Sequence, residues 1–201
     1  MTLTVLIGTR NANKKREIAE VLAGFPVRLL SLAEWGDAPD VVEDGSTFRD
    51  NAIKKATELA DATGQWVLAD DSGIEVDALG GRPGVLSARY AGPNATDKEN
   101  NAKLLKELEK VSAGERGAGY TCVIALARPG KLLGVVEGTC RGVIVNEPRD
   151  AGGFGYDPLF FVPELGRTFA EVLAEQKHAV SHRGRALQKL KELLAELLKE
   201  T

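Results

Sequence analysis

Two adjacent carboxylates, Asp70 and Asp71, follow the short apolar run at residues 66–68. Such a run is typical of a buried strand, and a carboxylate at its end needs a cation, hydrogen-bond donors or water, because desolvating it alone is costly. Ser72 and Gly73 add a hydroxyl and a flexible backbone, so we expect the strand to give way to a loop there. Ligands of α/β folds collect at the carboxyl ends of strands. The stretch is therefore a candidate site, with a solvated turn as the alternative.

A second group of polar residues follows the strand predicted at residues 3–7. The turn at residues 8–14 leads into a helix, and the free amides at a helix start favour an anion. The side-chain donors of this turn are Thr9, Arg10, Asn11, Asn13 and Lys14. The spacing of a Walker loop is absent. The turn therefore predicts a phosphate site, with a polar turn and a solvated basic helix as the alternative.

The helix predicted over residues 48–62 carries polar side chains on one part of its surface. Asn51 and Lys55 are four residues apart and are therefore neighbours on that surface. They face either solvent or the donors of the first turn. Glu43 lies in the polar loop before this helix and adds a carboxylate.

Glycines flank the aromatic residue Phe154 in the stretch 152–155. Glycine allows a backbone to approach a ligand closely, and an aromatic side chain at such a place can stack on a planar base. The alternative is a tight loop capped by a phenylalanine of the core.

Near the C-terminus, Ser181 is a natural N-cap that sets His182 and Arg183 in the first turn of the last helix. Two positive side chains there would oppose the helix dipole at a cost of about 0.3–1 kcal/mol, which an anionic or keto-bearing ligand would offset. His178 and His182 are four residues apart, but no third ligand is near them in the sequence. We therefore do not predict a zinc site.

Strands and helices of one compact unit must position these groups. The predicted strands cover residues 3–7, 27–32, 66–68, 120–127, 132–137 and 140–145. The predicted helices run from the first turn to Gly24, over 48–62, from Thr96 to about 111, over 169–175 and over 183–199. The last three strands are expected to be antiparallel, with a bend or bulge at Gly138 and Thr139, so the sheet is mixed.

Composition places the chain among ordinary globular proteins. Its 201 residues suit one domain, and 43% hydrophobic and 27% charged residues are average values. A formal net charge of −3 argues against binding polymeric nucleic acid through a general basic surface. The two cysteines have no metal or disulfide spacing, and no apolar run approaches the ~18 residues of a membrane span, so we expect a cytoplasmic protein without a membrane partner.

Taken together, these stretches resemble the inosine triphosphate pyrophosphatase family over essentially the whole chain. Five ordered motifs carry the resemblance: Thr9-Arg10-Asn11-x-x-Lys14-x-x-Glu17; Glu43-x-Gly45-x-Thr47-Phe48-x-x-Asn51-Ala52-x-x-Lys55-Ala56; Ala69-Asp70-Asp71-Ser72-Gly73 with Pro83-Gly84-Val85-x-Ser87-Ala88-Arg89-Tyr90; Gly153-Phe154-Gly155-Tyr156-Asp157-Pro158; and Lys177 with Ser181-His182-Arg183. The chain departs from its relatives at Arg10 and Asn13, where they vary. Lys54 beside Lys55 leaves open which lysine is functional.

The resemblance implies an α/β fold with a curved mixed β-sheet flanked by helices. Two lobes surround a deep cleft within a single domain spanning residues 1–201, and the protein is expected to be a homodimer. The implied activity is magnesium-dependent hydrolysis of deaminated purine nucleoside triphosphates (ITP, dITP and XTP) to the monophosphate and pyrophosphate.

The same resemblance assigns roles around the triphosphate. Magnesium takes hard carboxylate ligands, and the candidates are Glu43, Asp70 and Asp71. We predict Asp71 as the general base; Asp70 is a ligand or a support, and the two roles are not separated by the sequence. The predicted substrate contacts are Thr9, Arg10, Asn11, Asn13, Lys14, Lys55, Ser72, Phe154, Gly155, Tyr156, Asp157, Lys177, His182 and Arg183.

Within that set, Phe154 is expected to stack on the base, and Asp157, Lys177, His182 and Arg183 to line its edge. Donors aimed at a 6-keto oxygen favour hypoxanthine and xanthine, and a mismatched adenine loses roughly 1–3 kcal/mol for each unpaired polar group. Guanine shares the 6-keto group, so its rejection depends on contacts elsewhere, around its 2-amino group. Two alternatives stay open: a related pyrophosphatase with another base preference, and a non-enzymatic nucleotide-binding regulator.

Overall fold

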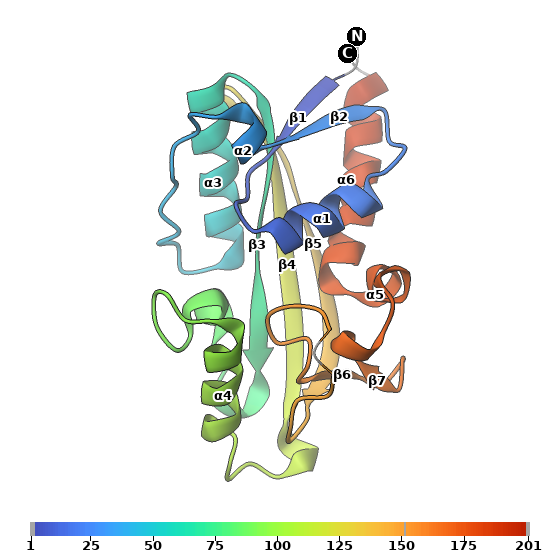
Figure 1. Ribbon diagram of the computed structural model, residues 1–201. Coiled ribbons are helices and arrows are strands. Elements are labelled where there is room, and N and C mark those ends of the chain that lie inside the picture. Colours follow the sequence, from blue (N-terminus) through green and yellow to red (C-terminus); the bar gives the residue numbers. More distant parts are fainter. Residues whose placement is uncertain (1–2, 151, 200–201) are drawn as a thin grey trace. The chain divides into compact units, whose positions relative to one another are not determined.

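The computed structural model describes residues 3–150 and 152–199 (Figure 1). Within them the strands form one seven-stranded sheet in the order β2-β1-β3-β4-β5-β6-β7. The strands are β1 (Leu3–Ile7), β2 (Val27–Ser31), β3 (Trp66–Val76), β4 (Gly117–Arg128), β5 (Lys131–Ile144), β6 (Phe160–Val162) and β7 (Arg167–Thr168). The α-helices are α1 (Ala12–Val21), α2 (Leu32–Trp35), α3 (Phe48–Thr63), α4 (Asp97–Glu107), α5 (Ala174–Val180) and α6 (His182–Lys199). Short 3₁₀ helices are η1 (Asp77–Leu79), η2 (Gly84–Arg89), η3 (Ala113–Glu115) and η4 (Phe169–Glu171).

The sheet is mixed, which confirms the predicted α/β class. Strand β1 is parallel to both β2 and β3, with Ile7 opposite Leu68 in the second pair. Strand β5 is antiparallel to β6, with Val143 opposite Phe161. Only a two-residue turn links β4 to β5, and a connection of that length joins antiparallel strands.

The chain divides into two compact units. The first comprises residues 3–71, 122–138 and 182–199 of the described chain, and the second comprises residues 72–121 and 139–181, apart from residue 151. Strands β3, β4 and β5 each contribute residues to both units. No helix of the described residues is long and apolar enough to cross a membrane.

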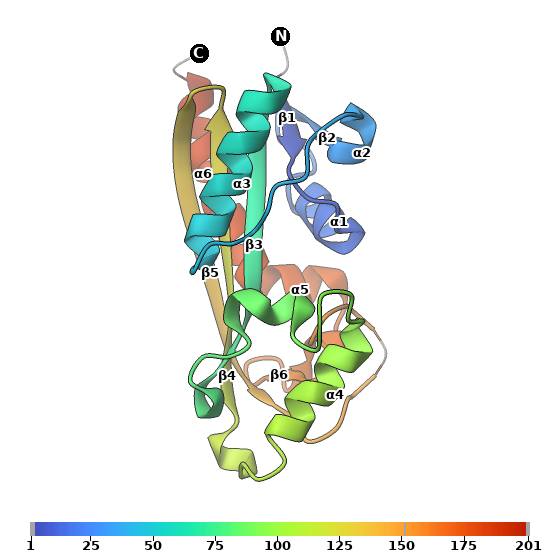
Figure 2. The ribbon, with the colours of Figure 1, turned by 90° about the vertical axis from the view of Figure 1, so that its left-hand side faces the viewer.

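In the first unit, α1 and α6 pack together against one face of the sheet, and α3 lies on the other face (Figures 1 and 2). Ile18 of α1 and Leu187 and Leu190 of α6 are fully buried in one apolar cluster with residues of β1, β3 and β4. The buried leucines of α6, Leu187, Leu190 and Leu194, are spaced so that they form one stripe along the helix. This packing fixes α1 and α6, two of the helices that carry polar residues of the site.

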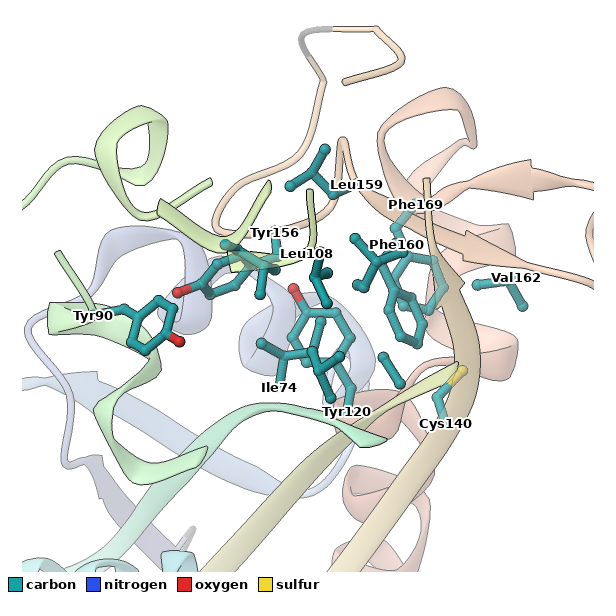
Figure 3. Packing of buried hydrophobic residues seen from close by; sticks show 14 of the residues in the cluster. Ile74, Tyr90, Leu108, Tyr120, Cys140, Tyr156, Leu159, Phe160, Val162 and Phe169 are labelled. Carbon is teal, nitrogen blue, oxygen red and sulfur yellow. The ribbon is translucent and has the colours of Figure 1, made fainter. Parts of the chain in front are cut away.

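The second unit has its own core, built around aromatic rings (Figure 3). The ring centroids of Tyr120 and Phe160 are 4.7 Å apart in an edge-on arrangement, and those of Phe160 and Phe169 are 5.3 Å apart. Tyr156 is also buried in this cluster, and its hydroxyl donates a hydrogen bond to the carbonyl of Ser87 at 2.8 Å. The aromatic packing anchors the chain just after Phe154, at Tyr156 and Phe160.

Two predicted breaks in strands are wrong. Ser72 and Gly73 lie inside β3, because the strand continues to Val76 instead of ending at the carboxylate pair. Gly138 and Thr139 likewise lie inside one continuous β5. A Cβ at Gly138 would clash with the backbone of α6 at His182 and Ala186, so close helix packing explains this glycine.

The C-terminal helices also differ from the prediction. The stretch predicted as one helix over 169–175 is the 3₁₀ helix η4, followed by α5, so Lys177 lies on a helix and not in a break. The short α2 was not predicted; Ser31 and Glu34 form its capping box. Thr47 caps α3 and Thr96 caps α4, so both helices begin where the sequence predicts them.

Candidate functional site

The turn after β1 passes close to β3. The amide of Gly8 donates to the carbonyl of Leu68 at 2.7 Å, and a Cβ at Gly8 would approach the side chain of Ala69 to 3.0 Å. Asn11 then caps α1: its Oδ1 accepts from the amides of Asn13 at 2.9 Å and Lys14 at 3.1 Å. The cap sets the lysine in the first turn of the helix, beside the end of the parallel strands.

Asp70 is buried in a positively charged environment. Its Oδ2 lies 3.0 Å from Nζ of Lys14 and 3.3 Å from Nη2 of Arg183, and the residue is 1% exposed. Burial alone would raise the pKa of Asp70, but the charges of Lys14 and Arg183 outweigh it and hold that pKa well below its usual range. Asp70 is therefore a charge-balanced carboxylate.

Asp71 has different surroundings, because successive side chains of a strand point to opposite faces. Its Oδ2 accepts a hydrogen bond from Nδ2 of Asn51 on α3 at 2.9 Å. Burial raises the pKa of Asp71, repulsion from Glu43 adds to the effect, and Lys14 and Asn51 only partly oppose it. The two neighbouring carboxylates thus have pKa values shifted in opposite directions.

Helix α3 supplies two buried polar side chains to the same face. Asn51 contacts Asp71, and one turn later Nζ of Lys55 lies 2.9 Å from Oε1 of Glu43. The side chain of Lys55 is 9% exposed, whereas that of Lys54 is 32% exposed and pairs with Asp44. Of the two adjacent lysines, Lys55 is therefore the one that lies beside the carboxylates.

A cavity of about 170 Å³ lies beside the first turn. Its walls include Gly8, Thr9, Arg10, Glu43 and Lys55. Arg10 also binds the loop before α3: its Nε lies 2.7 Å from Oδ1 of Asp40, and its Nη2 donates to the carbonyl of Ala38 at 3.1 Å. Of the predicted phosphate ligands, Thr9, Arg10 and Lys55 thus share one small cavity within the first unit.

Arg183 occupies a place that the sequence does not predict. Its Nη1 forms an ion pair with Glu17 of α1, its Nη2 contacts Asp70, and its side chain is 3% exposed. Burial alone would lower the pKa of Arg183, but these carboxylates outweigh that effect and raise it. His182 is also buried at the start of α6, in the first unit. The structure therefore brings Arg183 together with the carboxylates of α1 and β3.

In the second unit, Phe154 lies on a segment whose backbone is bound by Asp157, a residue of the same segment. Oδ2 of Asp157 accepts from the amide of Phe154 at 3.0 Å and lies 2.7 Å from Nζ of Lys177. That ammonium group sits 4.5 Å from the centroid of the half-buried Phe154 ring. A Cβ at Gly153 would clash with the Asp157 carboxylate, which explains a glycine there. Phe154, Asp157 and Lys177 therefore form one connected group.

The remaining predicted contacts lie in varied positions, from the core to the surface. Tyr156 is 4% exposed, and its hydroxyl is bound to Ser87, so it supports the segment from the core. Ser72 is half-buried within β3, and Oδ1 of Asn13 accepts from Arg16 at 3.1 Å at the surface. Gly155 has a φ of 62°, a left-handed conformation that favours glycine.

The carboxylates fit a magnesium ion that is bound together with a substrate. Among residues 3–150 and 152–199, no three Asp, Glu, His or Cys side chains converge as a ready-made metal site. Magnesium usually takes only one or two carboxylates and completes its shell with phosphate oxygens and water. Glu43 and Asp71 meet this requirement, because they are oxygen donors whose mutual repulsion a cation would relieve. Asp70 meets it less well, because Lys14 and Arg183 already balance its charge.

Sequence reasoning missed the role of Glu17 and gave Asn51 only a general one. Glu17 was noted as the end of the first motif, and its spacing of three residues from Lys14 was the available signal. Nothing in the spacing indicates its contact with Arg183, which lies 166 residues further along the chain.

Comparisons with known proteins agree with this picture. The chain is 57% identical over 190 residues to a dITP/XTP pyrophosphatase of Geobacter sulfurreducens, covering 94% of this chain and 96% of the relative. It is 50% identical over 194 residues to a dITP/XTP pyrophosphatase of Geobacillus kaustophilus, covering 96% and 95%. A HAM1 protein from Coxiella burnetii has a solved structure with a TM-score of 0.87 and 43% identity, covering 96% of this chain and 99% of that one.

The family model described as the Ham1 family matches residues 5–193, which includes every predicted site residue. The predicted family resemblance is thereby confirmed: the chain belongs to the Ham1 family.

Proposed function

We propose that this protein hydrolyses deaminated purine nucleoside triphosphates, namely dITP, XTP and ITP, to the monophosphate and pyrophosphate. The observation that carries the proposal is the buried Asp70–Asp71 pair, in which one carboxylate is balanced by cations and the other faces Asn51 and Glu43. Relatives with 50% identity or more over nearly the whole chain are named dITP/XTP pyrophosphatases, which supports the substrate class.

The triphosphate is proposed to bind at the cavity beside the first turn. Lys14 and Lys55 are the nearby ammonium groups, and hydrogen bonds from charged donors to phosphate are about twice as strong as neutral ones. Thr9 lines the cavity, and Asn11 lies on the same turn, where it caps α1. When bound, magnesium neutralises phosphate oxygens, and Glu43 and Asp71 are the residues that would hold it.

Asp71 is proposed to be the general base. A base must take a proton from water near neutral pH, and burial raises the pKa of this carboxyl above that of an ordinary aspartate. Asn51 holds one of its oxygens at 2.9 Å and so orients the carboxylate. Asp70 then serves as a support, because its two cation partners keep it ionised and keep Lys14 in place.

The base is proposed to bind at the second unit's group of Phe154, Asp157 and Lys177. The Phe154 ring offers a stacking face, and the Lys177 ammonium is a donor suited to a 6-keto oxygen. An adenine would instead place its 6-amino donor against that ammonium. His182 remains a proposed base contact, whereas the contacts of Arg183 favour a supporting role.

A homodimer is a further proposal that rests on the family resemblance. A cytoplasmic location is proposed because the sequence contains no apolar run of membrane-spanning length. The net charge of −3 supports a small nucleotide, and not polymeric nucleic acid, as the partner.

Pyrophosphate release from dITP, XTP, ITP, GTP, ATP and dTTP, with magnesium or with a chelator, tests the proposal. We expect fast turnover of the first three, little from the others, and loss of activity with chelator. Broad turnover would favour a pyrophosphatase with another base preference. Binding without turnover of any of the six would favour a nucleotide-binding regulator.

A further inference from the structure

We propose that Asp97 and Asn101 of α4 are positioning residues that hold the Phe154 segment in the geometry needed to bind the base. The proposal rests on the proposed function, because it gives these residues a task only if Phe154 contacts the nucleotide. Neither residue touches the predicted reacting atoms, and neither belongs to the predicted set of site residues.

The two side chains bind both backbone polar groups of Gly155. Oδ2 of Asp97 accepts from the amide of Gly155 at 2.6 Å, and Nδ2 of Asn101 donates to its carbonyl at 3.0 Å. The two residues are four apart and so lie one above the other on the same face of α4. A rigid helix therefore fixes both peptide groups of the residue that follows Phe154.

Gly155 is a position at which such fixation matters. Its φ of 62° is a conformation that glycine adopts easily but that also leaves glycine the freedom to depart from it. On the other side of Phe154, its own amide is bound by Asp157 at 3.0 Å. Phe154 is therefore held from two directions. Side chains of α4 bind the next residue, Gly155, and Asp157, which is paired with Lys177, binds the amide of Phe154 itself.

The two hydrogen bonds from Asp97 and Asn101 to Gly155, which we call the clamp, are not replaced by apolar packing between α4 and the segment. A groove of about 490 Å³ lies between α4 and the segment, and its walls include Asn101, Leu105, Pro148, Phe154 and Pro158. Where the helix and the segment are separated by open space, hydrogen bonds and not side-chain packing set their distance.

Asn101 does not contribute as much to the stability of the fold as a fully hydrogen-bonded side chain would. It is 8% exposed, and among the described residues its Oδ1 is buried without a hydrogen-bond partner. A buried acceptor of this kind is unfavourable, so the residue is better explained by what its Nδ2 holds. An apolar replacement of similar size should therefore leave the fold intact.

The test is steady-state hydrolysis of dITP by Asn101→Leu and Asp97→Ala, compared with wild type and with Phe154→Ala. Complete loss of base stacking weakens binding by roughly 5- to 150-fold, and a loosened segment should lose part of that. We expect KM to rise about 3- to 10-fold in each clamp variant with kcat within about twofold, since the binding step alone is affected. Asp97→Asn keeps an acceptor for the Gly155 amide and should restore most of the loss.

Asn100→Leu is the matched control. Asn100 is the neighbouring buried asparagine of α4 and also binds two backbone groups, the amide of Ala91 at 2.8 Å and the carbonyl of Ala88 at 3.2 Å. Its replacement should lower the melting temperature without raising KM. If Asn101→Leu behaves like Asn100→Leu, its role is structural and the proposal is overturned.

A double-mutant cycle shows whether the clamp acts through Phe154. Adding Asn101→Leu or Asp97→Ala to Phe154→Ala should raise KM by less than about twofold further, because the element that is positioned has been removed. Multiplying effects would overturn the proposal. Asp97 is exposed, so its variants stay informative if Asn101→Leu fails to fold. An unchanged KM in Phe154→Ala would refute base stacking itself, and an inactive wild type would refute the proposed function.

Discussion

Arg183 provides the sharpest contrast between the sequence and the structure. The family resemblance predicts a contact with the base, whereas the structure places its guanidinium against Glu17 and Asp70 with 3% of the side chain exposed. Arg183→Met keeps much of the apolar stem and removes only the charge and the donors. We expect it to destabilise the fold severely.

The magnitude follows from what the substitution leaves behind. Both carboxylates that face Arg183 are buried: Glu17 is 6% and Asp70 1% exposed, and Asp70 keeps its contact with Lys14 at 3.0 Å. Removing one partner of a buried ion pair costs about 3–5 kcal/mol, because the other charge stays buried without compensation. In a protein of this size each 1 kcal/mol lowers the melting temperature by about 2–4 °C, so we expect a decrease of roughly 6–20 °C.

Urea unfolding and thermal melting measure this effect directly. Arg185→Met is the control, because it changes an exposed arginine two residues further along the same helix and should alter stability by no more than about 0.5 kcal/mol. The double variant Glu17→Gln/Arg183→Met should recover part of the loss, since it also removes the buried negative charge that faces Arg183. An Arg183→Met protein as stable as wild type, but with weakened selection of XTP over ATP, would refute the structural role and restore the base contact.

Three further predictions concern the carboxylates and lysines of the first unit. Asp71→Asn should lower kcat by roughly 100- to 10,000-fold while binding of a non-hydrolysable dITP analogue, measured by calorimetry, is retained; unchanged turnover would refute the general base. Lys55→Met should raise KM for dITP by about tenfold or more and Lys54→Met by less than about twofold, and equal effects would contradict the placement of Lys55 beside Glu43. The folded pKa of Asp70 lies below its unfolded value, so its stabilisation is complete above the unfolded pKa and is lost as pH falls through that value toward the folded pKa. Between pH 5 and pH 3 wild type should therefore lose about 1 kcal/mol more unfolding free energy than Asp70→Asn, and parallel pH profiles in urea would contradict the shift.

Local patterns predicted most of the elements of this fold. Apolar patterns identified β1, α3 and α6, and the predicted starts of α3 and α4 agree with the caps at Thr47 and Thr96. Local propensity failed at Ser72 and Gly73, which weaken a strand in isolation but lie within a strand paired inside the sheet. Tertiary pairing overrides such a preference, and it is not visible in a short stretch of sequence.

The candidate site could likewise be predicted only in part, because local sequence does not show which distant segments come together. The residue types in the turn, in α3 and in the carboxylate pair indicated phosphate and metal chemistry without any structure. Which residues face each other depends on contacts between distant segments, such as Arg183 with Glu17 and Asn101 with Gly155. A spacing of three or four residues predicts a neighbour on one helix, but not the partner that another element supplies.

The adjacent carboxylates Asp70 and Asp71 differ in their proposed roles because they lie next to each other on a strand, where successive side chains point to opposite faces. Because β3 continues through Asp70 and Asp71, the strand alternation sends the first side chain toward Lys14 and Arg183 and the second toward Asn51. The first carboxylate gains cations and a lowered pKa, and the second gains burial, a like charge and a raised pKa. A loop at this point, as the sequence alone suggested, would impose no such alternation. The continuous strand is therefore the reason that two chemically identical neighbours can act as a support and as a base.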